Sequence, residues 1–209
     1  MNKYYSGQLF AGLLALLMLA GCVPSERISL FNGQDLSGWT FFLRDKGVDP
    51  ATVWSVSDGV ILCTGEPWGY MRTEADYADY QLHVEWRWPG EAGNSGVFLH
   101  MSQPDTVWPR SIECQLWSGR AGDFVAFQDV RFKELVRGRE LSKKAESSEK
   151  PLGQWNSYDI TCRGNTIRVL VNGVLQNEAT ETTESSGKIC LQSEGKPIEF
   201  RNIYVEPLE

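Results

Sequence analysis

The sequence lacks the motifs of several common enzyme classes. It has only two histidines, and it contains no G-x-S-x-G, no H-E-x-x-H and no phosphate-cradling glycine loop. These absences argue against α/β-hydrolase, zinc-peptidase and P-loop chemistry. A histidine-rich zinc site is disfavoured as well, although a divalent cation held by oxygen ligands remains open and no other cofactor is evident.

The chain also lacks an excess of basic charge. Its 20 lysines and arginines stand against 27 aspartates and glutamates, which gives a net charge of −7. Without a basic face to attract phosphate backbones, a nucleic-acid partner is not expected. No proline- or glycine-rich linker divides the sequence, so we expect one domain.

A long hydrophobic run is missing too. The apolar stretch from Leu9 to Ala20 is shorter than the ~20 residues that cross a bilayer. It follows Lys3 and ends in Leu19-Ala20-Gly21-Cys22, the pattern of a lipoprotein signal. We therefore expect a signal peptide over residues 1–21, a lipid on Cys22, a tether over 22–27 and a folded domain over 28–209. The lipid would hold the protein to a membrane of the cell envelope, facing the periplasm or the outer surface.

The four remaining cysteines show no C-x-x-C spacing. They are Cys63, Cys114, Cys162 and Cys190, and three of them alternate with apolar neighbours in strand-like segments. Disulfides could form outside the cytoplasm. The alternation nevertheless favours small buried hydrophobic residues over disulfide partners.

Apolar and polar residues alternate with period two in successive segments, which is typical of half-buried antiparallel strands. The segment 112–117 places Ile112, Cys114 and Leu116 on one face and Glu113 and Gln115 on the other. In residues 97–101 the same pattern sets Val97, Leu99 and Met101 against Phe98 and His100, and residues 81–88 alternate likewise.

Tight turns join some of these strands. Gly164-Asn165 and Asn172-Gly173 separate three short apolar runs and predict a β-meander, because both dipeptides tolerate positive φ. A shift in the alternation after Phe200 predicts a bulge near Asn202. Many short strands separated by turns predict an all-β sandwich of two sheets.

Polar side chains gather on the predicted exposed strand faces. The candidates are Glu85, His100, Glu113 and Gln115, with Asn94 in the turn Gly93-Asn94-Ser95-Gly96 and Arg110 before a strand. Aromatic residues in or beside loops, Trp68 and Trp117 among them, would suit stacking against a sugar ring. The alternative is an ordinary solvated sheet face with core aromatics nearby. An unassisted glycosidase needs two facing carboxyl groups, and here the strand of Glu113 offers no second one, although Glu85 could supply it.

Several ordered blocks carry a resemblance to a known family. They are residues 29–39 (SLFNGQDLSGW), 93–97 (GNSGV), 112–115 (IECQ), 154–156 (QWN), 171–173 (VNG), and 187–192 (GKICLQ) with 198–203 (IEFRNI). In this order they resemble the 3-keto-disaccharide hydrolase family over nearly the whole chain after residue 28. The resemblance implies a concanavalin-A-like jelly roll of two curved antiparallel sheets.

The resemblance also implies a reaction. The family acts on glycosides whose C3 hydroxyl a separate glycoside 3-dehydrogenase has oxidised to a ketone. The ketone acidifies C2, so a base could remove the C2 proton and the aglycone could leave before water adds. Either Glu113 or His100 would be the base. The family often has arginine where this chain has His100, and this departure leaves the choice between the two open.

Such a reaction also needs donors aimed at the developing enolate oxygen, and Gln115, Asn94 and Arg110 fit this role. A divalent cation on Glu113 is the alternative to these donors. The residues expected to contact the sugar are Asn94, Arg110, Glu85, Trp68, Trp117 and Gln192. Two other functions stay open. A non-catalytic carbohydrate-binding lipoprotein would have the same fold, and a scaffold would show an exposed apolar patch.

Overall fold

The computed structural model describes residue 1 and residues 26–208. Cys22, and the predicted signal segment apart from Met1, lie outside the described residues. The described chain is built of β-strands with one short 3₁₀ turn, Pro50–Thr52, and no α-helix. None of its elements is a helix long and apolar enough to cross a membrane.

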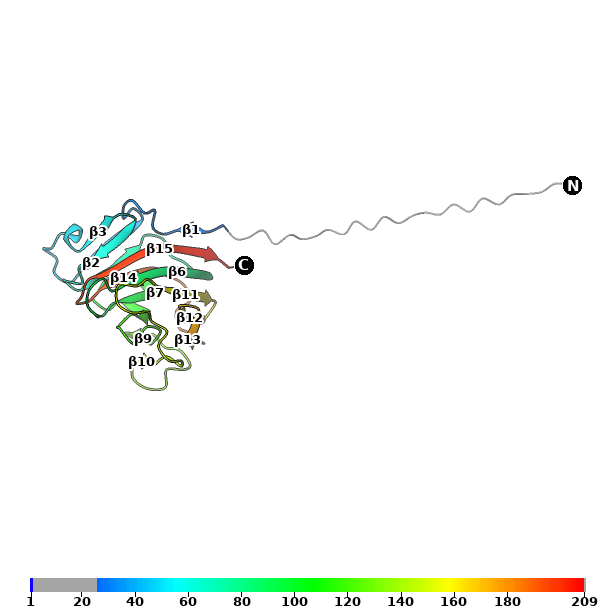
Figure 1. The fold of residues 1–209 in the computed structure, drawn as a ribbon. Helices are drawn as coiled ribbons and strands as arrows, with labels where there is room; N and C mark the ends of the chain where they lie inside the picture. The colour runs from blue at the N-terminus through cyan, green and yellow to red at the C-terminus, as the bar shows by residue number, and fades with distance from the viewer. Residues whose placement is uncertain (2–25, 209) are drawn as a thin grey trace.

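The strands form two antiparallel sheets (Figure 1). The eight-stranded sheet has the order β13-β12-β11-β6-β15-β4-β3, with β1 also paired to β15. Its strands are β1 (Ile28–Ser29), β3 (Trp54–Ser57), β4 (Val60–Cys63), β6 (Tyr80–Arg87), β11 (Asn156–Arg163), β12 (Thr166–Val171), β13 (Val174–Ala179) and β15 (Ile198–Pro207).

The seven-stranded sheet has the order β10-β9-β8-β7-β14-β5-β2. Its strands are β2 (Trp39–Leu43), β5 (Gly69–Thr73), β7 (Gly96–Ser102), β8 (Arg110–Gln115), β9 (Phe124–Phe127), β10 (Glu140–Leu141) and β14 (Lys188–Ser193). The predicted all-β, jelly-roll sandwich of two antiparallel sheets is confirmed.

The predicted turns are where the sequence placed them. Gly164, Asn172 and Gly173 have φ of 53°, 50° and 79°, and they close the hairpins of the β11-β12-β13 meander. Asn202 has φ of 49°, and the pairing of β15 with β6 shifts register around it. The predicted bulge therefore lies at Asn202.

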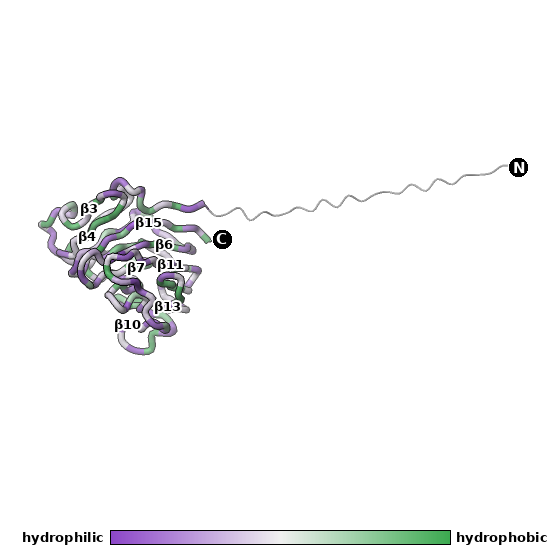
Figure 2. Tube along the Cα trace, in the orientation of Figure 1, coloured by the Kyte–Doolittle hydropathy of each residue, from purple (hydrophilic) through white to green (hydrophobic). Residues whose placement is uncertain are grey.

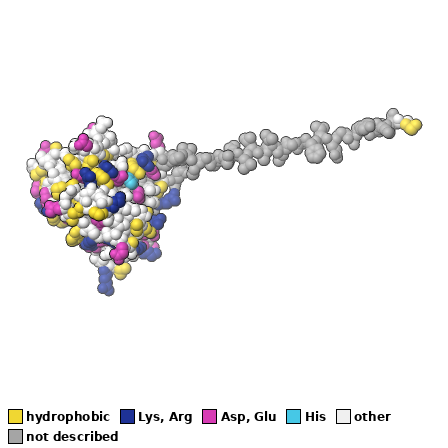
Figure 3. Space-filling model, in the orientation of Figure 1, with side chains coloured by type: hydrophobic (Ala, Val, Ile, Leu, Met, Phe, Trp, Pro, Cys, Tyr) yellow, Lys and Arg dark blue, Asp and Glu magenta, His cyan; other side chains and the backbone are white. Residues whose placement is uncertain are grey.

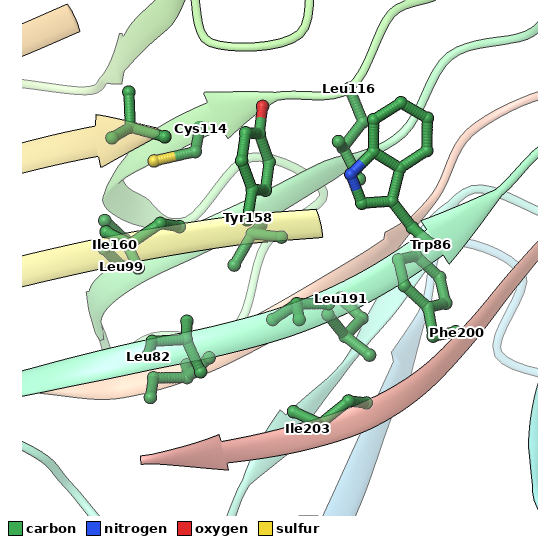
Figure 4. Close-up of a cluster of buried hydrophobic side chains, with 14 of the residues drawn as sticks. Leu82, Trp86, Leu99, Cys114, Leu116, Tyr158, Ile160, Leu191, Phe200 and Ile203 are labelled. Carbon is green, nitrogen blue, oxygen red and sulfur yellow. The ribbon is translucent and has the colours of Figure 1, made fainter. Parts of the chain in front are cut away.

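The core lies between the two sheets, as the close-up in Figure 4 shows. Trp86, Tyr158 and Phe200 reach it from the eight-stranded sheet and Leu99 and Leu116 from the other side, all fully buried. Each large apolar side chain buried in this way stabilises the fold by ~1.5–3 kcal/mol. Figure 2 shows the resulting alternation of hydrophilic and hydrophobic residues along the strands.

The four cysteines at positions 63, 114, 162 and 190 are buried and free of disulfide bonds. Burial raises the pKa of the Cys63 thiol to about 12. These residues therefore act as small apolar side chains, as the alternation predicted.

The seven-stranded sheet is apolar on both faces. Its inner face joins the core, and a second buried cluster covers part of its outer face; the members are Tyr70, Phe98, Met101, Val125, Phe127 and Cys190. A strand with apolar residues on both sides is unusual for an antiparallel sheet, which commonly leaves one face to water. This second cluster forms the dry surroundings of the candidate site.

Candidate active site

A cavity of 220 Å³ opens on the outer face of the seven-stranded sheet. Its floor is made by β8 and β9, and loop residues before β7, after β14 and before β10 close its sides. The lining residues are Asn94, Trp108, Glu113, Gln115, Trp117, Arg120, Val125, Phe127, Arg139, Glu140 and Glu194. The predicted register of β8 is confirmed, because Ile112, Cys114 and Leu116 lie in the core while Glu113 and Gln115 line this cavity.

Glu113 lies on the floor of the cavity and is only 2% exposed. Its pairing partners on the two neighbouring strands are Phe98 and Val125, both apolar. Its Oε1 atom has no hydrogen-bond partner within the described chain. Burial, followed by the negative charge of Glu194, raises the pKa of Glu113 well above the usual range of a carboxyl group.

Gly96 makes room for this carboxyl group. It pairs with Gln115 across β7 and β8, and an added Cβ would lie 2.0 Å from Oε1 of Glu113. The Glu113 side chain therefore occupies the space that a side chain at position 96 would fill. This close approach explains the second glycine of Gly93-Asn94-Ser95-Gly96.

A second carboxyl group, Glu194, follows the end of β14. Nδ2 of Asn94 donates a hydrogen bond to its Oε2 atom at 2.9 Å, and the nearby Gln192 side chain favours its ionised form. Burial raises the pKa of Glu194, while Gln192 and Arg139 oppose the rise. The negative charges of Glu194 and of Glu140, a third carboxyl group in the lining, thus both disfavour ionisation of Glu113.

Two arginines balance these acids unequally. Arg120 donates to Asp123 at 2.7 Å and to Glu140 at 2.9 Å, so its charge is already paired. Arg139 forms no ion pair with any residue of the described chain, and it lowers the pKa of both Glu113 and Glu194. Arg139 is therefore the cation available to an anionic group in the cavity.

Amide groups complete the polar part of the site. Gln192 is 3% exposed, and its Oε1 and Oδ1 of Asn94 have no hydrogen-bond partners within the described chain. Oε1 of Gln115 instead accepts a bond from the backbone N–H of Trp117 at 2.9 Å. Buried oxygens without partners cost free energy, so a ligand that brings several hydroxyl donors would be favoured.

Aromatic rings border the opening. Trp108 and Trp117 line the cavity and are 40% and 49% exposed. Trp68 packs edge-on against Trp108, with ring centroids 5.8 Å apart. Flat, partly exposed rings beside polar groups provide a surface on which a sugar ring can stack.

The family model described as "3-keto-alpha-glucoside-1,2-lyase-like domain" matches residues 26–206. The chain belongs to this family. Membership confirms the resemblance seen in the sequence, and it places the chain among carbohydrate-acting domains. No curated protein matches the sequence.

Solved structures show that this lyase-like domain shares the fold of several carbohydrate-active proteins. A protein from Parabacteroides distasonis, provisionally assigned as a glycosyl hydrolase, has a TM-score of 0.66 at 22% identity and covers 86% of this chain and 93% of its own. The β-glucanase of Bacillus licheniformis has a TM-score of 0.60 at 15% identity and covers 90% and 100%. The carbohydrate-binding module CBM66 of Bacillus subtilis has a TM-score of 0.59 at 12% identity and covers 81% and 95%.

Within the lyase-like domain, Glu85 lies away from the other predicted site residues. It belongs to β6 in the opposite sheet, where Arg201 and Asn202 donate to it at 2.6 and 2.9 Å. A cavity of 550 Å³ lies there, but Glu85 and His83 are already paired with Arg201 and Asp159. The expectation that Glu85 joins Glu113 was wrong, because residues 81–88 and 112–117 enter different sheets.

His100 also departs from its predicted position. Its backbone has φ of 55° where the pairing of β7 with β8 shifts, so the alternation ends at Leu99. The His100 ring is fully buried and lies edge-on to Tyr80 at 5.7 Å, while Met101 takes the place on the outer face. Burial lowers the pKa of His100. The expectation of an exposed His100 beside Glu113 was wrong.

Arg110 is engaged elsewhere. Its Nε donates to Glu184 at 3.0 Å, and it forms a further ion pair with Asp129. It shares its face of β8 with Ile112, not with Glu113. Arg110 is thus absent from the cavity lining, and Arg139 supplies the cation in its place.

The sequence analysis missed Glu194 and Arg139. Glu194 stands two residues after Gln192, at the end of a block that resembles the family, so period two places both on one face. That spacing was the available signal. Arg139 lies before the two-residue strand β10 in an irregular segment, and no local pattern pointed to it.

Proposed function

We propose that this lyase-like domain cleaves the glycosidic bond of sugars oxidised to a ketone at C3, by β-elimination followed by addition of water. The observation that carries the proposal is the buried carboxyl group of Glu113, whose Oε1 has no hydrogen-bond partner in the described chain, in a cavity that Arg139 also lines. This combination supplies a base and a group to stabilise the anion that the base creates.

Glu113 acts as the base in this proposal. A C3 ketone acidifies the hydrogen on C2, and a carboxylate in water is a weak base for such a proton. Dry surroundings raise the pKa of Glu113, so its ionised form is a stronger base than an exposed glutamate. Removing the C2 proton leaves negative charge on the C3 oxygen.

Arg139 and the cavity amides stabilise that oxygen. Arg139 is an exposed residue that lines the cavity, and its positive charge there would lower the energy of a developing enolate. Gln115 has its Oε1 held by the backbone of Trp117, which orients its amide N–H donors. A divalent cation bound by Glu113 or Glu194 is an alternative electrophile, although no group of three or more His, Cys, Asp or Glu residues in the described chain could hold a metal ion.

The size of the cavity favours a small glycoside. Its 220 Å³ is below the ~300–1,000 Å³ of sites for drug-sized ligands, so it suits one oxidised sugar ring. The unpartnered Oδ1 of Asn94 would accept a bond from one of its hydroxyl groups, whereas the predicted sugar contact Gln192 does not line the cavity. Trp117 and Trp108, with Trp68 behind, would contact the ring or the aglycone.

The decisive experiment compares two substrates. The mature domain, with and without chelator, is incubated with a 3-keto disaccharide and with the parent disaccharide. We expect sugar release from the keto form only, and we expect Glu113→Gln to reduce it on the order of 10²-fold or more with the fold retained. Equal cleavage of the parent compound, or full activity of the variant, would contradict the proposal.

A non-catalytic carbohydrate-binding domain is the second candidate. The likeness to CBM66 and the aromatic border of the cavity favour it. In that case the 3-keto disaccharide would bind, as seen by calorimetry, without any release of product. A separate dehydrogenase would supply the ketone for the catalytic function alone.

We further propose that Cys22 carries a lipid that holds the domain to a membrane of the cell envelope. The proposal is supported by the sequence Leu19-Ala20-Gly21-Cys22. Full-length protein should partition into the detergent phase, and Cys22→Ser should move it to the aqueous phase. A serine variant that stays with the membrane would refute lipidation at this residue.

A further inference from the structure

We infer that Glu194 is a second catalytic group, the general acid that protonates the oxygen leaving C1. This inference rests on the proposed function and adds a role that the base alone cannot fill. A sugar alkoxide is a poor leaving group, so its departure is accelerated when a positioned acid donates a proton to it.

Two elements fix the position of Glu194. Its backbone forms a bridge with that of Asn94 on the neighbouring segment, and the Asn94 side chain donates to its Oε2. Gln192, two residues earlier at the end of β14, lies near enough to lower the pKa of Glu194. Asn94 is in turn positioned by Ser95, whose hydroxyl donates to the Gln192 carbonyl at 2.7 Å.

The depths of the two carboxyl groups separate their roles. Glu113 sits on the floor, between strands, and is almost fully buried, whereas Glu194 follows the end of β14 and is half-buried. An aglycone must depart toward solvent, past the more exposed group. Glu113 is therefore suited to the sugar ring and Glu194 to the leaving oxygen.

Burial is the main effect that favours the protonated form of Glu194. Burial and the nearby Glu66 raise its pKa, while Gln192 and Arg139 oppose the rise. The charge of Glu194 also raises the pKa of Glu113. Glu140 also lines this cavity, and each negative charge there favours the protonated form of a neighbouring carboxyl group.

The proposed step balances. The Glu113 carboxylate takes the proton from C2, and the C–H electron pair forms the enolate of the C3 ketone. As the enolate collapses, a C1–C2 double bond forms, the C1–O1 bond breaks, and O1 takes the proton of Glu194. One proton has then moved from C2 to the aglycone. Transfer of the proton from Glu113 to Glu194 restores the starting state.

The test uses Glu194→Gln with two leaving groups. On a 3-keto disaccharide, where the leaving group is a sugar alkoxide, we expect a loss on the order of 10²-fold or more. On the 3-keto 4-nitrophenyl glycoside, whose leaving group needs no acid, we expect a loss of less than about 10-fold. Glu113→Gln should impair both substrates.

A second measurement isolates the base. The 3-keto derivative of 1,5-anhydroglucitol has no leaving group at C1, and exchange of its C2 hydrogen in D₂O needs Glu113 alone. NMR should show exchange with wild type and Glu194→Gln but not with Glu113→Gln. Glu199→Gln, a partly buried and ion-paired carboxyl on the other sheet, is the matched control and should behave as wild type.

The outcomes separate the two proposals. If wild type neither cleaves nor exchanges any 3-keto compound, the proposed function fails. If wild type cleaves them but Glu194→Gln loses both leaving groups equally, or loses C2 exchange, Glu194 is not the acid and the inference is overturned.

Discussion

The carboxyl group of Glu113 lies directly over Gly96, at the spot where any other residue would place its Cβ. Phe98 and Val125 flank it along the sheet, so the missing side chain at position 96 is what lets a charged group lie among apolar neighbours. The position of the proposed base thus depends on the absence of a side chain at Gly96, the first residue of β7.

Replacing Gly96 by alanine should displace that carboxyl group. We expect Gly96→Ala to fold and to lose turnover of a 3-keto glycoside on the order of 10²-fold, since a misplacement of about 1 Å can have that effect. Gly90→Ala is the control, because nothing lies within 4 Å of a Cβ at that position. Equal activity of the two variants would show that the Glu113 position is not critical.

Removing the charge of Arg139 should affect rate and pH dependence together. Arg139→Gln takes away the cation that lowers the pKa of Glu113, so the rise of activity with pH should move to higher pH. The maximal rate should fall by about 10²-fold through loss of enolate stabilisation. Arg168→Gln, on the other sheet beside Glu178, serves as control. An unchanged pH profile would exclude Arg139 from the site.

The burial of Glu113 should reduce stability at neutral pH. Its pKa is raised in the folded state, so folding holds a proton that the unfolded chain releases near pH 4.5. Stability is lost as pH rises from that value through the folded pKa. Glu113→Gln should therefore match wild type at low pH and exceed its Tm near pH 7, by ~2–4 °C for each kcal/mol. A Tm difference independent of pH would contradict the buried position.

His100 should matter for stability and not for chemistry. Asparagine tolerates positive φ, so His100→Asn tests the ring without straining the backbone. Losing the contact with Tyr80 should lower the free energy of unfolding by about 1–3 kcal/mol, measured in denaturant. The folded protein should keep at least half of its kcat on a 3-keto glycoside. A large loss of kcat in the folded variant would restore His100 as a candidate base.

Features of the site that depend on neighbouring residues could be predicted from the sequence, whereas features that depend on residues far apart in the chain could not. Alternation within 112–117 is local, and it gave the correct faces of Glu113 and Gln115. Which sheet a strand joins is not local, so Glu85 was placed with the wrong partners. One left-handed residue, His100, reversed the faces of the residues after Leu99.

Long-range placement also explains what was missed. Glu194 and Arg139 reach the cavity from segments 55 residues apart, through pairing that only the complete sheet defines. On the face shown in Figure 3, acidic and basic side chains are interspersed with apolar ones. Composition constrains partners, whereas the site depends on topology.

Strand β1, at the start of the folded domain, pairs with β15 in the eight-stranded sheet, whereas the cavity opens on the outside of the seven-stranded sheet (Figure 1). Whatever precedes residue 26 therefore joins the domain through the layer that does not carry the cavity. A membrane anchor ahead of residue 26 would therefore lie away from the opening of the cavity. Sugars could then diffuse in and products could leave while the protein stays anchored.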